Sequence, residues 1–130
     1  ELSGEVLVYD APAFTLLQRI QADEVKAGGS ADIHMHPSGR YLYTSHRLDN
    51  DGISVFAVGE DGLLDKIAYT RTGRHPRNFM ITPDGRLLMV TCMHDNLIQV
   101  FRIAENGILF VTKASNLRFT KRVLVLKSMR

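Results

Sequence analysis

Short segments of this chain place hydrophobic residues at positions that would alternate between the two faces of a β-strand. Between residues 40 and 46, for example, Tyr41, Tyr43 and Ser45 would share one face, and Leu42 and Thr44 the other. These segments are rich in β-branched or aromatic residues and are bounded by Gly, Asn, Asp or Pro, as strands and turns require. No window shows sustained helical periodicity beside good caps. The pattern predicts an all-β fold with strands over residues 4–9, 14–20, 32–36, 40–46, 53–58, 64–70, 78–82, 86–92, 97–103 and 108–113.

The strands follow one another in a repeat of about 45 residues. Pro37-Ser38-Gly39-Arg40 matches Pro83-Asp84-Gly85-Arg86 at an offset of 46 residues, and residues 53–58 match residues 98–103 at an offset of 45. A partial third copy opens the chain at Gly4. Residues 11–20 could pass for a short helix, but we assign residues 14–20 to a strand because they fill that place in the repeat. Periods of this length are typical of solenoids, propellers and arrays.

Four antiparallel strands in about 45 residues correspond to one blade of a β-propeller. The repeat divides the chain into the last two strands of one blade (1–30), two complete blades (31–73 and 74–115) and an atypical basic tail (116–130). The tail lacks the Pro and Gly of the repeat, although residues 123–126 could form one strand. A propeller closes with about 4–8 blades. We therefore expect a partial propeller that belongs to a longer protein, or copies that self-associate through their unpaired blade edges.

The net charge of +2 hides an uneven distribution. Residues 1–105 carry ten basic and fourteen acidic side chains, a net charge of −4, whereas residues 106–130 carry six basic and no acidic side chains. A few spread basic residues usually form a solvated face, so we expect no nucleic-acid partner.

The composition is that of an ordered, soluble chain, with 45% hydrophobic and 23% charged residues. No apolar run approaches the length of a membrane span, and Glu1-Leu2-Ser3-Gly4 is not a signal peptide. We expect no membrane partner, and the compartment, cytoplasmic or periplasmic, stays open. The single cysteine, Cys92, excludes an internal disulfide.

Five segments have an order and spacing that belong together: residues 31–43, Ser45-His46-Arg47, and residues 53–56, 73–79 and 83–86. As a set they resemble the C-terminal part of the lactonase-like seven-bladed propellers. That family includes the propeller-type 6-phosphogluconolactonases and the fungal-type 3-carboxy-cis,cis-muconate lactonizing enzymes, or 3-carboxymuconate cyclases. The resemblance covers about residues 4–112 and implies a protein of seven blades, of which this chain is about the last third.

The resemblance implies hydrolysis of an anionic sugar lactone such as 6-phosphogluconolactone, or the related muconate-type lactonizing reaction, with no cofactor. A non-catalytic propeller that binds a small anionic ligand or a protein is the alternative, because a fold alone does not decide function. We cannot place the family's catalytic histidine and glutamate in this chain, so the isolated chain is expected to be inactive.

Candidate substrate-binding residues lie where the copies of the repeat differ. The Pro-Gly turn at residues 37–39 lies on one face of the propeller, and the loop that begins at Arg47 and the connection at residues 73–77 open on the other. The resemblance implies that Arg47 and Arg77 are funnel arginines that hold the anionic substrate. A guanidinium group binds carboxylate or phosphate in a planar fork and can stabilise an oxyanion. The alternative is an arginine that only covers a sheet edge.

The histidines and one carboxylate complete the candidate site. His75 is the candidate acid–base residue, since imidazole titrates near neutral pH. His94, in the equivalent loop of the next blade, is a candidate for substrate binding, and Asp32 is the carboxylate that we consider as a catalytic base. His34 and His36 have the spacing of metal ligands, but no Asp, Glu or Cys cluster accompanies them, so we expect no metal site.

Overall fold

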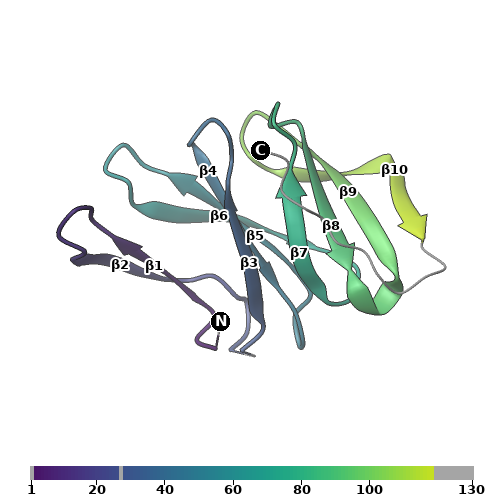
Figure 1. The fold of residues 1–130 in the computed structure, drawn as a ribbon, viewed down its shortest axis with the longest axis horizontal. Helices are drawn as coiled ribbons and strands as arrows, with labels where there is room; N and C mark the ends of the chain where they lie inside the picture. The colour runs from purple at the N-terminus through teal and green to yellow at the C-terminus, as the bar shows by residue number, and fades with distance from the viewer. Residues whose placement is uncertain (1, 27, 119–130) are drawn as a thin grey trace.

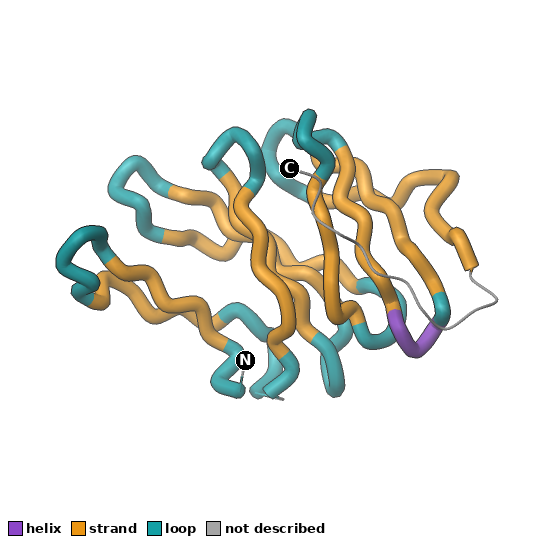
Figure 2. Tube along the Cα trace, viewed as in Figure 1, coloured by secondary structure: helices purple, strands orange, loops and turns teal. Residues whose placement is uncertain are grey.

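The computed structural model describes residues 2–26 and 28–118, which form three antiparallel sheets side by side (Figure 1). The first sheet pairs β1 (Glu5–Tyr9) with β2 (Leu16–Gln21). The second has the order β3 (Ser30–Met35), β4 (Tyr41–His46), β5 (Gly52–Val58) and β6 (Leu64–Arg71). The third has the order β7 (Pro76–Ile81), β8 (Leu87–Cys92), β9 (Leu97–Ile103) and β10 (Leu109–Arg118). A short 3-10 turn, η1 (Met93–Asp95), joins β8 to β9 and is purple in Figure 2.

The predicted all-β fold is confirmed, and β2 forms where a short helix was the alternative. The strands begin and end within two residues of the predicted ranges, except at the end of β10. That strand continues to Arg118 because its pairing with β9 resumes after a register shift between Val111 and Asn116. The boundaries between blades stay a prediction, and the strand suggested for residues 123–126 lies outside the described residues. No helix in the described part of the chain is long and apolar enough to cross a membrane.

The second sheet is buried on both faces because successive residues of a strand point to opposite sides. In β4, Tyr43 packs into a core shared with the third sheet, and Leu42 packs into a core shared with the first. Val55 and Phe56 of β5 divide in the same way. The core between the second and third sheets contains Tyr43, Ile53, Val55, Phe79, Leu88, Val90, Cys92, Phe101, Ile103 and Leu109.

Side-chain hydrogen bonds link neighbouring sheets at fixed points. The Tyr43 hydroxyl donates to the carbonyl of Gly107 at 2.8 Å, inside the core. The Tyr41 hydroxyl makes the matching bond to the Glu105 carbonyl at 2.8 Å, but in an exposed place. Because an unpaired buried carbonyl is costly, the buried bond fixes the register of the two sheets more strongly than the exposed one.

The repeated Pro-Gly phrase forms turns at one edge of the sheets, the upper edge in Figure 1. Gly39 and Gly85 have φ angles of 72° and 71°, a region that glycine adopts without strain. The N–H of Gly39 donates to the His36 carbonyl, and that of Gly85 to the Thr82 carbonyl. The loops at residues 47–51, 72–75 and 93–96 lie at the opposite edge, as Figure 2 shows, so the two edges have different roles.

We expect Tyr43→Phe to lower the free energy of unfolding by about 1–3 kcal/mol, because it leaves the Gly107 carbonyl buried without its donor. Tyr41→Phe removes the same atom from an exposed bond and should cost less than about 1 kcal/mol. Urea unfolding of both variants checks the difference. Equal losses would show that the buried bond has no special role.

Candidate functional site

Three loop segments meet at the edge opposite the Pro-Gly turns: residues 47–51 after β4, residues 72–75 before β7, and residues 93–96 after β8. We call them the loop cluster. Residues 47–51 join two strands of the second sheet, residues 72–75 connect the second sheet to the third, and residues 93–96 join two strands of the third sheet. The cluster therefore lies over the boundary between two sheets, where side chains from both can approach one another.

His75 lies at the centre of the loop cluster and is only 8% exposed. Its N–H donates to Asp51 Oδ1 at 2.8 Å, and its carbonyl accepts the N–H of Met93 at 3.1 Å. Its imidazole stacks on that of His94, with 4.2 Å between ring centroids and 31° between ring planes. The backbone of His75 has a φ angle of 62°, the left-handed region that residues other than glycine rarely adopt.

The electrostatic surroundings lower the pKa of His75. Burial contributes most, since it disfavours the charged imidazole, and the positive charges of His94, Arg47 and Arg77 act in the same direction. Asp51 opposes them. A lowered pKa keeps the imidazole neutral near neutral pH, and a neutral imidazole can accept a proton. The loop cluster thus combines positive charge with a proton acceptor.

Arg74 and Asp95 fasten the η1 turn to the connection before β7. Asp95 accepts the Arg74 N–H with Oδ2 at 2.6 Å and the Arg74 Nε–H with Oδ1 at 2.7 Å. The N–H of His94 also donates to the Arg74 carbonyl at 3.3 Å. These bonds raise the pKa of Arg74, first through the hydrogen bond to Asp95 and then through its charge. Together they place the imidazole of His94 beside that of His75.

Arg47 and Arg77 approach His75 from different sheets. Arg47 follows β4, and its N–H donates to the Gly29 carbonyl at 3.0 Å. Gly29 permits this approach, because a Cβ there would collide with the carbonyl oxygen of Arg47. Arg77 is the second residue of β7, and its side chain is exposed. Four of the five candidate residues from the sequence, His75, His94, Arg47 and Arg77, thus lie together.

Asp32 is the candidate that the structure does not bring into the loop cluster. Its Oδ2 accepts hydrogen bonds from Asn78 Nδ2 at 2.7 Å and from the Phe79 N–H at 3.1 Å, both on β7, and lies 3.1 Å from His34 Nε2. Burial would raise the pKa of Asp32, but the hydrogen bonds from His34 and Phe79 outweigh it and lower the pKa. A carboxylate held in this way is a weak base, so the catalytic role of Asp32 stays a prediction without structural support.

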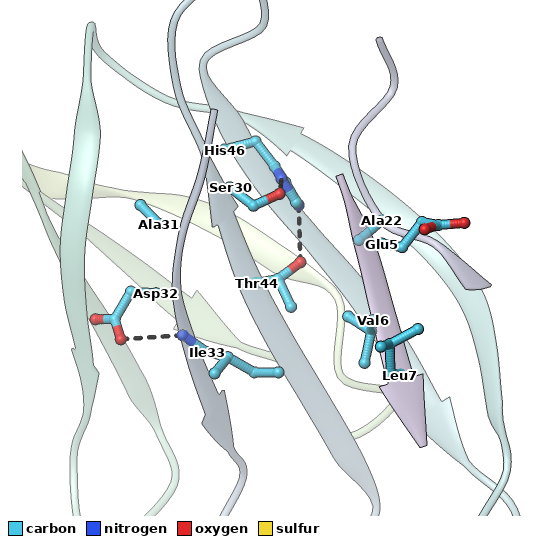
Figure 3. A pocket seen from close by; sticks show the side chains of 10 residues that line it. All are labelled: Glu5, Val6, Leu7, Ala22, Ser30, Ala31, Asp32, Ile33, Thr44 and His46. Atoms are coloured by element: carbon cyan, nitrogen blue, oxygen red, sulfur yellow. Dashed lines mark hydrogen bonds between the residues drawn. The ribbon is translucent and has the colours of Figure 1, made fainter. Parts of the chain in front are cut away.

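A pocket of about 230 Å³ opens elsewhere, between β1 and the pair β3–β4 (Figure 3). His46 lines it and is fully buried, with Nε2 2.8 Å from Thr44 Oγ1 and Nδ1 3.1 Å from Ser30 Oγ. Burial lowers the pKa of His46 to about 4, against the opposing charge of Asp23, so the ring is neutral near neutral pH. Both ring nitrogens already have partners, and this histidine therefore packs the boundary between the first and second sheets.

The structure separates the two histidines that have metal-ligand spacing. His34 pairs with Asp32, whereas His36 contacts Ser38 Oγ through Nδ1 and the Gly85 carbonyl through Nε2, at 2.8 and 2.9 Å. Within residues 2–26 and 28–118, no group of three or more His, Cys, Asp or Glu side chains could hold a metal ion.

No sequence pattern indicates Asp51 and Arg74, although both contact residues of the loop cluster. Asp51 acts on His75 across 24 residues of sequence, and Arg74 acts on Asp95 across 21. Neither contact has a local signal, because each joins a loop of one sheet to a loop beside the next. Only the packing of the second sheet on the third brings them together.

The family model described as a seven-bladed β-propeller lactonase matches residues 1–126. The chain belongs to this lactonase family. Its two four-stranded sheets are accordingly blades of a partial β-propeller, as the repeat predicted.

Curated relatives with the name 6-phosphogluconolactonase are similar to this chain. One from Formosa agariphila is 45% identical over 76 residues, which cover 56% of this chain and 22% of the relative. One from Yersinia pestis is 34% identical over 114 residues, which cover 82% of this chain and 34% of the relative. The chain thus spans about a third, or less, of the length of these relatives.

Solved structures of similar proteins have the same fold. A Bacteroides fragilis protein, provisionally named 6-phosphogluconolactonase, matches with a TM-score of 0.85 and 42% identity over 91% of this chain and 34% of its own. The periplasmic gluconolactonase of Pseudomonas aeruginosa matches with a TM-score of 0.76 and 26% identity, also over 91% of this chain and 34% of its own.

We expect Asp32→Asn to destabilise the folded chain by about 1–3 kcal/mol at pH 7, because an amide in place of the carboxylate opposes the amide of Asn78 and weakens the bond to Phe79. Since the pKa of Asp32 is lowered in the folded state, its contribution is present above the unfolded pKa and is lost as the pH falls through the folded value. As the pH falls below 5, the free energy of unfolding should therefore decrease less in the variant than in the wild type.

Urea unfolding across this pH range measures both effects. Asp65→Asn is the matched control, because Asp65 is an exposed residue of β6. A pH dependence that is the same in Asp32→Asn and in the wild type would contradict the role assigned to Asp32.

Proposed function

We propose that this chain supplies part of the substrate site of a lactonase that hydrolyses an anionic sugar lactone of the 6-phosphogluconolactone kind. The observation that carries the proposal is the neutral imidazole of His75, which stacks on His94 and feels the positive charges of Arg47 and Arg77. The names of the relatives support the same reaction class. No finding favours the muconate-type lactonizing reaction, which stays a prediction.

In this proposal Arg47 and Arg77 bind the phosphate or carboxylate of the substrate through their guanidinium groups. A water oxygen attacks the lactone carbonyl carbon, and His75 accepts the water proton. The bond between that carbon and the ring oxygen then breaks, and the ring oxygen leaves as a hydroxyl group with the proton that His75 returns. His94 keeps the imidazole of His75 in place and adds a polar contact at the rim. Groups beyond this chain complete the site, so the chain alone is expected to be inactive.

Removal of one cluster arginine tests the anion site. In the whole protein, Arg47→Ala or Arg77→Ala should weaken the binding of 6-phosphogluconate about tenfold to a hundredfold, since a charge-assisted hydrogen bond contributes roughly 1.5–3 kcal/mol. Lysine at either position should restore only part of the affinity, because it keeps the charge and loses the planar fork. Calorimetric titration measures the dissociation constants.

Arg40 and Arg86 provide the matched controls, because both are exposed beside the Pro-Gly turns at the opposite edge of the sheets. Their alanine variants should bind as the wild type does. If they weaken binding as much as the cluster variants while the protein stays folded, the anion site lies on the other face.

We also propose that the 130-residue chain by itself self-associates through the exposed side of β1 and β3. Ile33 and Met35 of β3 are 51% and 50% exposed, whereas Phe79, at the position of Ile33 in the next copy of the repeat, is 1% exposed. In the described residues β1 pairs with β2 alone, so its other edge offers free backbone donors and acceptors. A second copy can cover both the apolar side chains and this edge.

Light scattering of the chain over a range of concentrations tests this association. The mean mass should rise with concentration, and Ile33→Lys should shift the rise to higher concentration because it places a charge on the covered face. Ile67→Lys, on the outer strand β6, is the control and should leave the curve unchanged. A constant monomer mass at high concentration would contradict the proposal.

A further inference from the structure

The position before β7 combines two features that conflict with its residue type. His75 has a φ angle of 62°, and Pro76 follows it. A residue other than glycine is disfavoured in the left-handed region, and the residue before a proline is pushed towards the extended region. Local preference therefore works against the conformation that the backbone adopts here, and the surroundings must hold it.

The equivalent position in the preceding blade does not share this conformation. Before β3 that position is Gly29, whose carbonyl accepts the N–H of Arg47, just as the carbonyl of His75 accepts the N–H of Met93. Gly29 is not among the residues with a positive φ angle, and a Cβ there would collide with the carbonyl oxygen of Arg47. The left-handed backbone is therefore a feature of His75 in the second copy and not a requirement of the repeat. Strain of this kind is typical of functional positions.

One side chain holds the strained residue from the neighbouring blade. Asp51 Oδ1 accepts the N–H of His75 at 2.8 Å, while the Asp51 backbone carbonyl accepts the N–H of Thr72 at 3.3 Å. Asp51 thus ties the connection before β7 to the loop after β4 at two points. With the bond from Met93 on its other side, the backbone of His75 is fixed at both its N–H and its carbonyl.

We propose that Asp51 is a positioning residue, which holds His75 in its left-handed conformation so that the imidazole stacks on His94 within the influence of Arg47 and Arg77. Asp51 acts through the backbone of His75 and not through the substrate. The consequence for catalysis rests on the proposed lactonase function, whereas the consequence for the histidine stack does not. The side-chain oxygen that accepts the His75 N–H is the feature that matters, and asparagine at position 51 retains it whereas alanine lacks it.

The stack itself can be observed in the whole protein with histidine labelled by carbon-13. Ring-current shifts of the His75 and His94 ring protons report the 4.2 Å stack. We expect Asp51→Ala to abolish these shifts and Asp51→Asn to retain them. Asp51→Val, which keeps bulk beside His75 without an acceptor, replaces Asp51→Ala if that variant does not fold. Asp49→Asn, an exposed carboxylate in the same loop, is the matched control and should leave the shifts unchanged.

Hydrolysis of 6-phosphogluconolactone by the same variants provides the second measurement. Asp51→Ala should lower kcat about tenfold or more with KM within about twofold, since misplacement of a reacting group acts on the chemical step. Asp51→Asn should stay within about threefold of the wild type. A merely structural role would lower the amount of folded protein and leave kcat per folded molecule unchanged.

Two results would overturn the proposal: an intact histidine stack in both variants that lack the acceptor, or equal damage in Asp51→Asn and Asp51→Ala, which would assign the effect to charge. If the wild type does not hydrolyse the lactone, the proposed function fails, but the ring-current shifts still decide whether Asp51 positions His75.

Discussion

The arrangement of this protein depends on the burial of one sheet between two others. The alternation along β4 and β5 sends Tyr43 and Val55 to one core and Leu42 and Phe56 to the other. Because the two faces of a strand differ by a single residue, a slip of one position would exchange the two cores entirely. The register of the second sheet therefore fixes the relative positions of all three sheets, and the loops at their ends follow.

The polar contacts between sheets depend on this register. Asp32, which is half-buried, joins β3 to β7, and the buried hydroxyl of Tyr43 joins β4 to the turn after β9. At the edge, Asp51 and Asp95 make the corresponding contacts between loops. The same boundary is thus held by apolar packing, by buried hydrogen bonds and by loop contacts. The residues of the candidate site lie at the end of this boundary, where the loop contacts of Asp51 and Asp95 hold them.

The strands and the gathering of four candidate residues could be predicted from the sequence, because both depend on local signals and on the repeat. Residues close together in the sequence determine the period-two alternation and the turns at Gly39 and Gly85. The connectivity of a blade then determines which loops share an edge of the sheet. The contact between Asp51 and His75 could not be predicted, since it depends on the left-handed backbone of His75. The contacts of Asp32 could not be predicted from the sequence either, because its partners belong to the next sheet.

The bonds between Arg74 and Asp95 bear on how the proposed substrate site can change. The segment between β8 and β9 is only four residues long, residues 93–96, and it is tied to the neighbouring connection through both backbone and side chain. An insertion there would move Asp95 away from its partner and disturb the position of His94. New specificity is thus more readily obtained by substitution at residues 93 and 94 than by a longer loop. For protein engineering, single substitutions suit residues 93–96 better than the insertion of a longer loop does.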